Sequence, residues 1–252
     1  MSEAPPGKAE ERHSPVKRAA FAVCLALLAV ALAALGTWQV QRLAWKRDLI
    51  ARVDERVHAA AVPAPARADW DKVNAGDDEY RRVNVAGRLA NDKETLVYAS
   101  TALGPGYWVM TPLMLADGTA ILINRGFVPT DRRDPATRRQ GQVQGPVEIT
   151  GLMRMTEPKG SLLQSNDVGT DRWYSRDVAA IAQKRGVAAV APYFIDADAT
   201  ANPGGLPVGG LTVIHFPNNH LVYAITWYGL AAMALALLVF ILRVEIGRDR
   251  HG

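Results

Sequence analysis

Two uncharged, strongly apolar stretches dominate the pattern of hydrophobic and polar positions along the chain. The first runs from Ala19 to Gln41, and the second runs from Leu221 to Leu242. At about 1.5 Å rise per residue, each stretch is long enough as a helix to cross a hydrocarbon layer of roughly 30 Å. We therefore expect transmembrane helices over 19–41 and 218–242, flanked by tails at 1–18 and 243–252.

The first stretch also has a competing interpretation as a cleaved signal peptide. Ala31-Leu32-Ala33 resembles a small-residue cleavage site after a basic start. Two features favour a retained helix instead. The uncharged run continues past that site, and Trp38 followed by Arg42 and Trp45 is typical of a helix that leaves the membrane through its interface.

The segment between the two stretches changes its periodicity once. Apolar and charged residues alternate at helical spacing from Gln41 to Ala60, so residues 42–79 are predicted to hold a juxtamembrane helix and a linker. From Tyr80 the period changes toward two, which indicates strands. We expect a mainly antiparallel β domain over 80–217, a sandwich or small barrel with one or two helices. The fold class is thus a membrane protein of the α+β type.

Several apolar runs within 80–217 predict individual elements. Strands are predicted over Val83–Leu89, Thr95–Ala99, Tyr107–Leu113, Thr119–Val128, Val147–Met155, Tyr193–Asp196 and Leu211–Phe216. Asp117-Gly118 between two of these runs is typical of a hairpin turn. Pro112 cannot donate to a ladder and is expected at a strand end or an edge. A short helix is predicted from Val178 to Gly186, and a charged loop from Asp131 to Gln144.

The charges beside the two stretches predict the orientation. The first tail carries Lys and Arg and the second carries Arg, and although several basic residues follow the first stretch, no Lys or Arg occurs between Arg185 and Arg243. The positive-inside rule then favours cytoplasmic tails. Acidic residues in the first tail are not typical of a mitochondrial transit peptide. We therefore expect a multi-pass protein of a bacterial inner (plasma) membrane with its main domain in the periplasm.

Composition narrows the function. The net charge of +4 is modest, and much of the basic excess lies beside the apolar stretches, so we expect contact with the lipid bilayer and no nucleic-acid partner. The single cysteine, Cys24, lies in the first stretch, which excludes a disulfide within the β domain. Motifs for phosphate loops, nucleophile elbows and zinc proteases are absent, and we do not expect an enzyme.

Two groups of residues can be considered as metal ligands. His220 opens the second stretch beside Asn218 and Asn219, either as a ligand or as an interfacial residue where an asparagine caps the helix. Met153 and Met155 share one strand face and could suggest Cu(I), although methionines commonly fill gaps in cores.

Four separated segments together resemble the Surfeit locus protein 1 family. They are Leu35–Lys46, Gly106–Leu113, Asn124–Pro129 and Asn218–Trp227. The Gly-x-Trp-Gln and Asn-Asn-His pieces at the two membrane edges are specific in combination. Phe127 and Val222 depart from the family pattern, in which Trp and Gln are common at these places.

The resemblance implies a function that the residues alone do not. Members assist assembly of haem–copper cytochrome c oxidase, so the resemblance implies a chaperone that binds haem a and assists its insertion into oxidase subunit I, with haem a synthase as a further partner. It implies His220 as the axial ligand of the haem iron. We expect Trp38 and Trp227 to flank the ring, and Arg42 or Arg125 to pair with a propionate.

Two alternatives are distinct from a haem carrier. The protein could be a membrane scaffold that stabilises immature subunit I or haem a synthase without carrying cofactor. It could also be a copper-delivery protein, which the lack of cysteine in the β domain disfavours.

Overall fold

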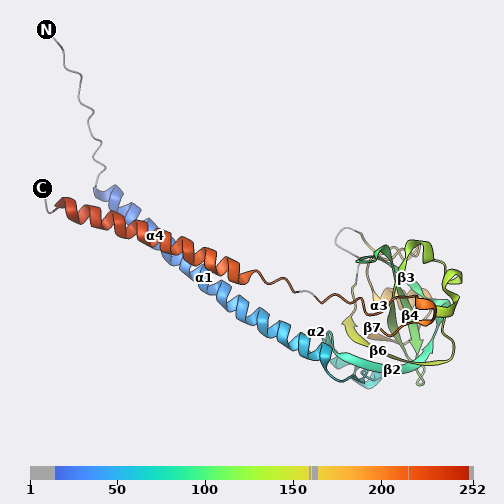
Figure 1. Ribbon diagram of the computed structural model, residues 1–252. Coiled ribbons are helices and arrows are strands. Elements are labelled where there is room, and N and C mark those ends of the chain that lie inside the picture. The colour runs from blue at the N-terminus through green and yellow to red at the C-terminus, as the bar shows by residue number, and fades with distance from the viewer. Residues whose placement is uncertain (1–14, 159, 161–163, 215, 250–252) are drawn as a thin grey trace, which may run out of the picture. The chain divides into compact units, whose positions relative to one another are not determined.

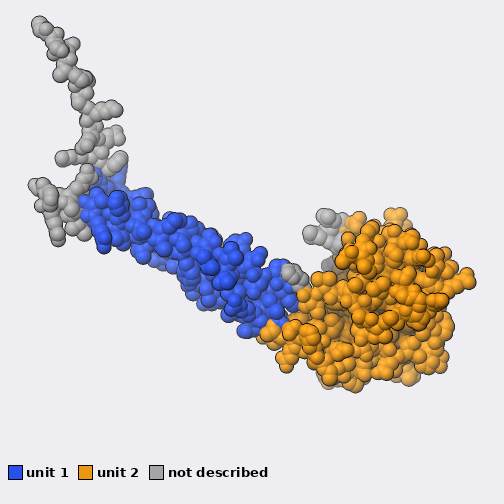
Figure 2. Space-filling model, viewed as in Figure 1, with its two compact units in different colours: residues 1–50, 216–252 blue, residues 51–215 orange. Residues whose placement is uncertain are grey.

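The computed structural model describes residues 15–158, 160, 164–214 and 216–249, which separate into two compact units (Figure 2). Residues 1–50 and 216–252 form the first, here called the helix unit, and residues 51–215 form the second, the barrel unit.

The helix unit consists of two long helices, most of α1 (Pro15–His58) and α4 (His220–Asp249) (Figure 1). α1 continues without a break past the apolar stretch to His58, so the first part of the predicted juxtamembrane segment is helical. Only 11% and 6% of the most apolar windows of the two helices are buried, so neither is the core helix of a soluble protein. Their length and exposed apolar surface fit a membrane, and the protein is a membrane protein.

The helices pack along a stripe of mostly small or apolar residues. On α1, Leu25, Gly36 and Leu43 are buried, together with the polar Gln39, and on α4 the buried residues include Ala224. Small residues let two helices approach closely without the hydrophobic driving force that water supplies.

The barrel unit is built on seven strands, which Figure 1 shows wrapped around a common centre. They are β1 (Val62–Pro63), β2 (Arg82–Leu89), β3 (Thr95–Thr101), β4 (Gly104–Met114), β5 (Ala120–Pro129), β6 (Pro146–Met155) and β7 (Val190–Ala197). Their order is β1-β2-β6-β7-β5-β4-β3, and an additional β2–β4 pairing closes five of them into a barrel. Most pairs are antiparallel, while β5–β7 and β1–β2 are parallel. The small barrel is therefore the correct one of the two predicted architectures.

The β4–β5 hairpin confirms the turn predicted at Asp117-Gly118. Met114 pairs with Ala120, and the Asp117 carboxylate accepts a hydrogen bond of 2.9 Å from the backbone N–H of Thr119. Gly118 has a φ of 81°, which a side chain would oppose. Pro112 lies where β4 passes from its partner β3 to its partner β2, and its carbonyl accepts from Ala90 at 2.8 Å. The nitrogen of Pro112, which carries no hydrogen, thus faces the junction between β3 and β2.

Short helices cover the barrel. The predicted helix is α3 (Val178–Arg185), which Asp177 caps by accepting from the Ala180 N–H at 3.1 Å and which ends at the left-handed Gly186. The other short elements are α2 (Ala75–Asp78), η1 (Arg67–Lys72), η2 (Asn91–Lys93), η3 (Thr130–Arg132), η4 (Pro135–Gly141) and η5 (Pro203–Gly205). The segment predicted as a charged loop over 131–144 therefore contains 3₁₀ turns.

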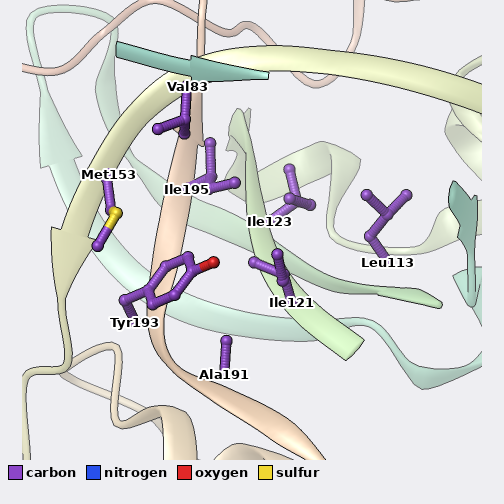
Figure 3. Packing of buried hydrophobic residues seen from close by; sticks show 8 residues of the cluster. All are labelled: Val83, Leu113, Ile121, Ile123, Met153, Ala191, Tyr193 and Ile195. Atoms are coloured by element: carbon purple, nitrogen blue, oxygen red, sulfur yellow. The ribbon is translucent and has the colours of Figure 1, made fainter. Parts of the chain in front are cut away.

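The interior of the barrel is apolar (Figure 3). Its buried members are Val83, Leu113, Ile121, Ile123, Met153, Ala191, Tyr193 and Ile195. Met153 is fully buried here with Met155 packed against the same cluster, so both methionines serve as core residues. The Tyr193 hydroxyl donates to the Pro65 carbonyl at 2.9 Å, and burial raises the pKa of Tyr193.

The strand predicted over Leu211–Phe216 is wrong for the described residues of that segment. Residues 211–214 and 216 carry no strand, and His215 lies outside the described residues. Thr212 bonds to the Asp196 carboxylate at 3.0 Å, whereas Val213 is 83% exposed. The nearest strand, β7, is already paired on both sides by β6 and β5, so it offers no edge to a further strand.

Candidate functional site

His220 is the first residue of α4, and its ring makes one specific contact with α1. Its Nδ1 lies 2.7 Å from the side-chain oxygen Oε1 of Gln39. An amide oxygen can only accept, so Nδ1 is the donor in this contact, and the neutral tautomer that makes it has its lone pair on Nε2. Nε2 makes no hydrogen bond to a described residue. This imidazole is therefore competent to coordinate a metal.

The capping interpretation of this region receives no side-chain hydrogen bond from either asparagine among the described residues. The Asn218 Oδ1 atom is buried and has no hydrogen-bond partner among the described residues. Asn219 contributes its backbone carbonyl, which accepts from Tyr223 at 3.2 Å. An orphaned polar atom two residues before the imidazole leaves an acceptor unused beside the candidate ligand.

The Gly36-Thr37-Trp38-Gln39 segment sets the distance between the two helices. A Cβ on Gly36 would lie 2.9 Å from Cε1 of Tyr228, so glycine permits the ring to lie against α1. The Thr37 hydroxyl lies 3.0 Å from the Tyr228 hydroxyl. Three of these four residues thus contact α4, and the fourth, Trp38, is 51% exposed.

The other predicted site residues of the helix unit lie on its surface. Arg42 is exposed and places its guanidinium carbon 4.6 Å from the ring centroid of Trp45. Trp227 is half-buried on α4. No hydrogen bond among the described residues joins Trp38, Trp227 or Arg42 to His220, so their roles as ring walls and propionate partner stay predictions.

Arg125 belongs to the barrel unit and is only 2% exposed. Its guanidinium donates to the Asn91 and Asn202 side-chain oxygens at 3.2 and 3.3 Å and to the Gly141 carbonyl. Burial lowers the pKa of Arg125 to about 10, against the attraction of nearby Glu94. These contacts tie three loops to β5 and account for the burial of the side chain without a ligand.

A second polar cluster, which the sequence analysis missed, lies beneath a cavity of about 490 Å³ in the barrel unit. The buried carboxylate of Asp196 accepts from Asn124 at 2.7 Å, Arg154 at 3.0 Å, Arg176 at 3.1 Å and Thr212 at 3.0 Å. Trp108 lines the same cavity. The only signal in the sequence is an aspartate that ends an otherwise apolar strand.

Further carboxylates balance the two arginines of this cluster. Arg154 donates to Glu79 at 2.8 Å, and Arg176 donates to Glu157 at 3.0 Å. Burial opposes the charge of Glu157, but the hydrogen bonds and charge of Arg176 outweigh it and lower the pKa of Glu157. Two cations and three carboxylates leave no positive excess for an anionic ligand. We interpret the cluster as a structural network of ion pairs and hydrogen bonds that joins β5, β6 and β7 to the loops at 157, 176 and 212.

Within the described part of the chain, no group of three or more His, Cys, Asp or Glu side chains could hold a metal ion. A haem does not need such a group, because the porphyrin supplies four nitrogens to the iron and a protein supplies one or two axial ligands.

Two apolar membrane helices, a closed mixed barrel and one ligand-competent imidazole define a membrane protein with a folded domain between its anchors. The profile of the SURF1 family matches residues 26–232. The chain belongs to the SURF1 family, which is associated with cytochrome oxidase assembly and consists generally of assembly factors. The resemblance found in the sequence is confirmed.

Relatives match over most of their length. Surfeit locus protein 1 of Rattus norvegicus is 40% identical over 214 residues, covering 79% of this chain and 68% of that protein. Its Homo sapiens counterpart is 38% identical over 225 residues, covering 82% and 73%. The SURF1-like protein of Monosiga brevicollis is 37% identical over 231 residues, covering 86% and 85%.

Proposed function

We propose that this protein is an assembly factor that holds haem a through His220 and assists its insertion into subunit I of a haem–copper terminal oxidase. The observation that carries the proposal is the hydrogen bonding of the His220 ring. Its Nδ1 is hydrogen-bonded to Gln39, and its Nε2 makes no hydrogen bond to the described residues. Haem a synthase and oxidase subunit I are the partners that this role requires. The flanking charges favour a bacterial plasma membrane with the barrel unit in the periplasm.

The residues of the helix unit fit the chemistry of haem a. The macrocycle and its isoprenoid tail are apolar, and α4 exposes Leu221, Val222 and Tyr223 immediately after His220. When bound, the porphyrin supplies four of the iron ligands, so one imidazole is sufficient to anchor it. Arg42 is the better of the two predicted propionate partners, because the donors of Arg125 are already engaged within the barrel unit.

The test is haem content after co-expression with the enzymes that make haem a. We expect stoichiometric haem a in the detergent-purified protein, by absorption and pyridine haemochrome assay, and its loss in His220→Ala. His58→Ala is the matched control, because His58 is an exposed imidazole that pairs with Asp54 one turn earlier. Unchanged haem in His220→Ala would overturn the proposal. Folded but colourless protein that still copurifies oxidase subunits would instead support the scaffold function.

A further inference from the structure

We propose that Gln39 is a positioning residue for the haem ligand: its side-chain carbonyl accepts the Nδ1 proton of His220 and so keeps the Nε2 lone pair available to iron. This inference rests on the proposed function. It gives the side-chain amide of Gln39 a role that membership of the SURF1 family does not provide.

Gln39 is a buried polar residue on an apolar helix, and its side chain is hydrogen-bonded to His220. Gln39 is 9% exposed, whereas its neighbours Trp38 and Val40 are 51% and 45% exposed. An amide turned inward on an apolar spanning helix is costly unless it is hydrogen-bonded. Its hydrogen-bond partner is the imidazole of His220, 181 residues away in the chain. The hydrogen bond that stabilises the buried Gln39 amide therefore also fixes the orientation of the His220 ring.

The chemistry depends on which nitrogen carries the proton. A neutral imidazole has one N–H, and only the nitrogen without it can bind a metal. Without an acceptor at Nδ1 the proton can move to Nε2, where it blocks coordination. An acceptor also increases the basicity of the ligand nitrogen, and loss of such a partner typically weakens metal binding about 10- to 100-fold.

The helix packing explains why the contact is maintained. Gly36 lies against the Tyr228 ring of α4 less than one turn before Gln39 on α1. This close approach holds the two helices at a spacing that a 2.7 Å contact between Gln39 and His220 requires. The Gly-x-Trp-Gln segment thus contains both the spacer and the acceptor.

The test uses the full chain in detergent, freed of haem and titrated with haem a, as the wild type, as His220→Ala and as three further variants. Gln39→Leu keeps a similar volume but removes the acceptor. Gln39→Glu retains an acceptor and strengthens it. Tyr228→Phe, the matched control, removes the neighbouring contact between the helices at Thr37 and leaves the imidazole partner in place.

We expect Gln39→Leu to weaken haem affinity about 10- to 100-fold and to raise the midpoint potential, because a less basic ligand stabilises ferric iron less. Gln39→Glu should retain binding and lower the potential, and Tyr228→Phe should match the wild-type protein in both. The midpoint potential separates a positioning role of Gln39 from a role in helix packing alone. Looser packing does not change the basicity of the ligand in opposite directions in Gln39→Leu and Gln39→Glu.

The outcomes distinguish this inference from the proposed function. A wild-type protein that binds no haem, or His220→Ala that binds it fully, overturns both. Loss of haem in His220→Ala with wild-type affinity and potential in Gln39→Leu leaves the proposed function standing and overturns the role of Gln39. An affinity loss shared equally by Gln39→Leu and Tyr228→Phe, with no change in potential, also overturns it.

Discussion

Arg138 and Glu94 form a two-pronged ion pair that is almost completely buried, although 44 residues separate them in the chain. Arg138 Nη1 donates to Glu94 Oε2 at 3.1 Å, Nη2 donates to Oε1, and the two side chains are 1% and 9% exposed. Removing one partner leaves an uncompensated buried charge. We predict that Glu94→Ala lowers the free energy of unfolding by about 3–5 kcal/mol.

Urea unfolding of the full chain in detergent, followed by tryptophan fluorescence, measures this change because Trp173 is fully buried in the barrel unit. Asp69→Ala is the control, since Asp69 pairs with Lys72 on the surface and exposed pairs contribute little. Equal effects of the two substitutions would contradict the prediction.

The helix pair gives a second prediction from two glycines. Gly36→Ala places a Cβ 2.9 Å from the Tyr228 ring, so the ring must move and its contact with Thr37 is disturbed. A Cβ on Gly229 meets nothing within 4 Å. We expect a lower thermal unfolding midpoint in detergent for Gly36→Ala and none of this loss for Gly229→Ala. A matching decrease in both variants would show that close helix approach is not required.

Glu157 predicts how stability depends on pH. The pKa of Glu157 is lower in the folded protein than its ordinary value of 4.5, chiefly because Arg176 outweighs the effect of burial. The folded state therefore binds fewer protons than the unfolded state in this range, and the carboxylate stabilises the fold fully above pH 4.5. That contribution decreases as the pH falls from 4.5 through the folded-state pKa.

We expect Glu157→Gln to be less stable than the wild type at neutral pH and to lose less stability on acidification. Urea midpoints at neutral pH and below pH 4.5 measure the difference. Glu148→Gln removes an exposed carboxylate from β6 and controls for charge loss. A constant difference between Glu157→Gln and the wild type at every pH would refute the assignment.

Gly126 and Gly118 separate backbone strain from steric exclusion. Both have positive φ, 126° and 81°, but only at Gly126 would a Cβ meet a backbone atom, the Val208 carbonyl oxygen at 2.1 Å. We expect Gly118→Ala to cost roughly 1–2 kcal/mol from backbone strain alone. Gly126→Ala should cost clearly more in the same urea experiment, because Val208 and Phe127 exchange backbone hydrogen bonds there and neither can move freely.

Local patterns predicted the elements of the barrel unit but not their closure. Alternation located β2 to β7, and Asp117-Gly118 located a hairpin, because both signals lie within a few residues. The β2–β4 pairing that turns the sheet into a barrel involves only Arg88 with Met114 and Leu89 with Leu113. A sandwich would have the same alternation, so the sequence left both architectures open.

The polar contacts show the same limit. The sequence indicates His220 because this imidazole directly precedes the second apolar stretch, but its partner Gln39 lies 181 residues away. The sequence offers Arg125 as one of two candidate propionate partners, with Arg42, whereas the contacts of Arg125 come from the loops at Asn91, Gly141 and Asn202. Contacts between residues far apart in the sequence depend on the tertiary fold, which the periodicity of apolar residues does not encode.

The position of β7 in the barrel determines when this protein can acquire its shape during synthesis. β3, β4 and β5 form a meander of neighbours in the sequence, but β7 must enter between β5 and β6 before the ring of strands is complete. Ladders between distant segments form late, because the intervening chain must first be ordered. The ribosome has therefore made the chain through Ala197 before closure is possible, and the next long element is α4, beginning at His220. Barrel closure therefore requires almost the whole barrel unit, from β2 to the end of β7.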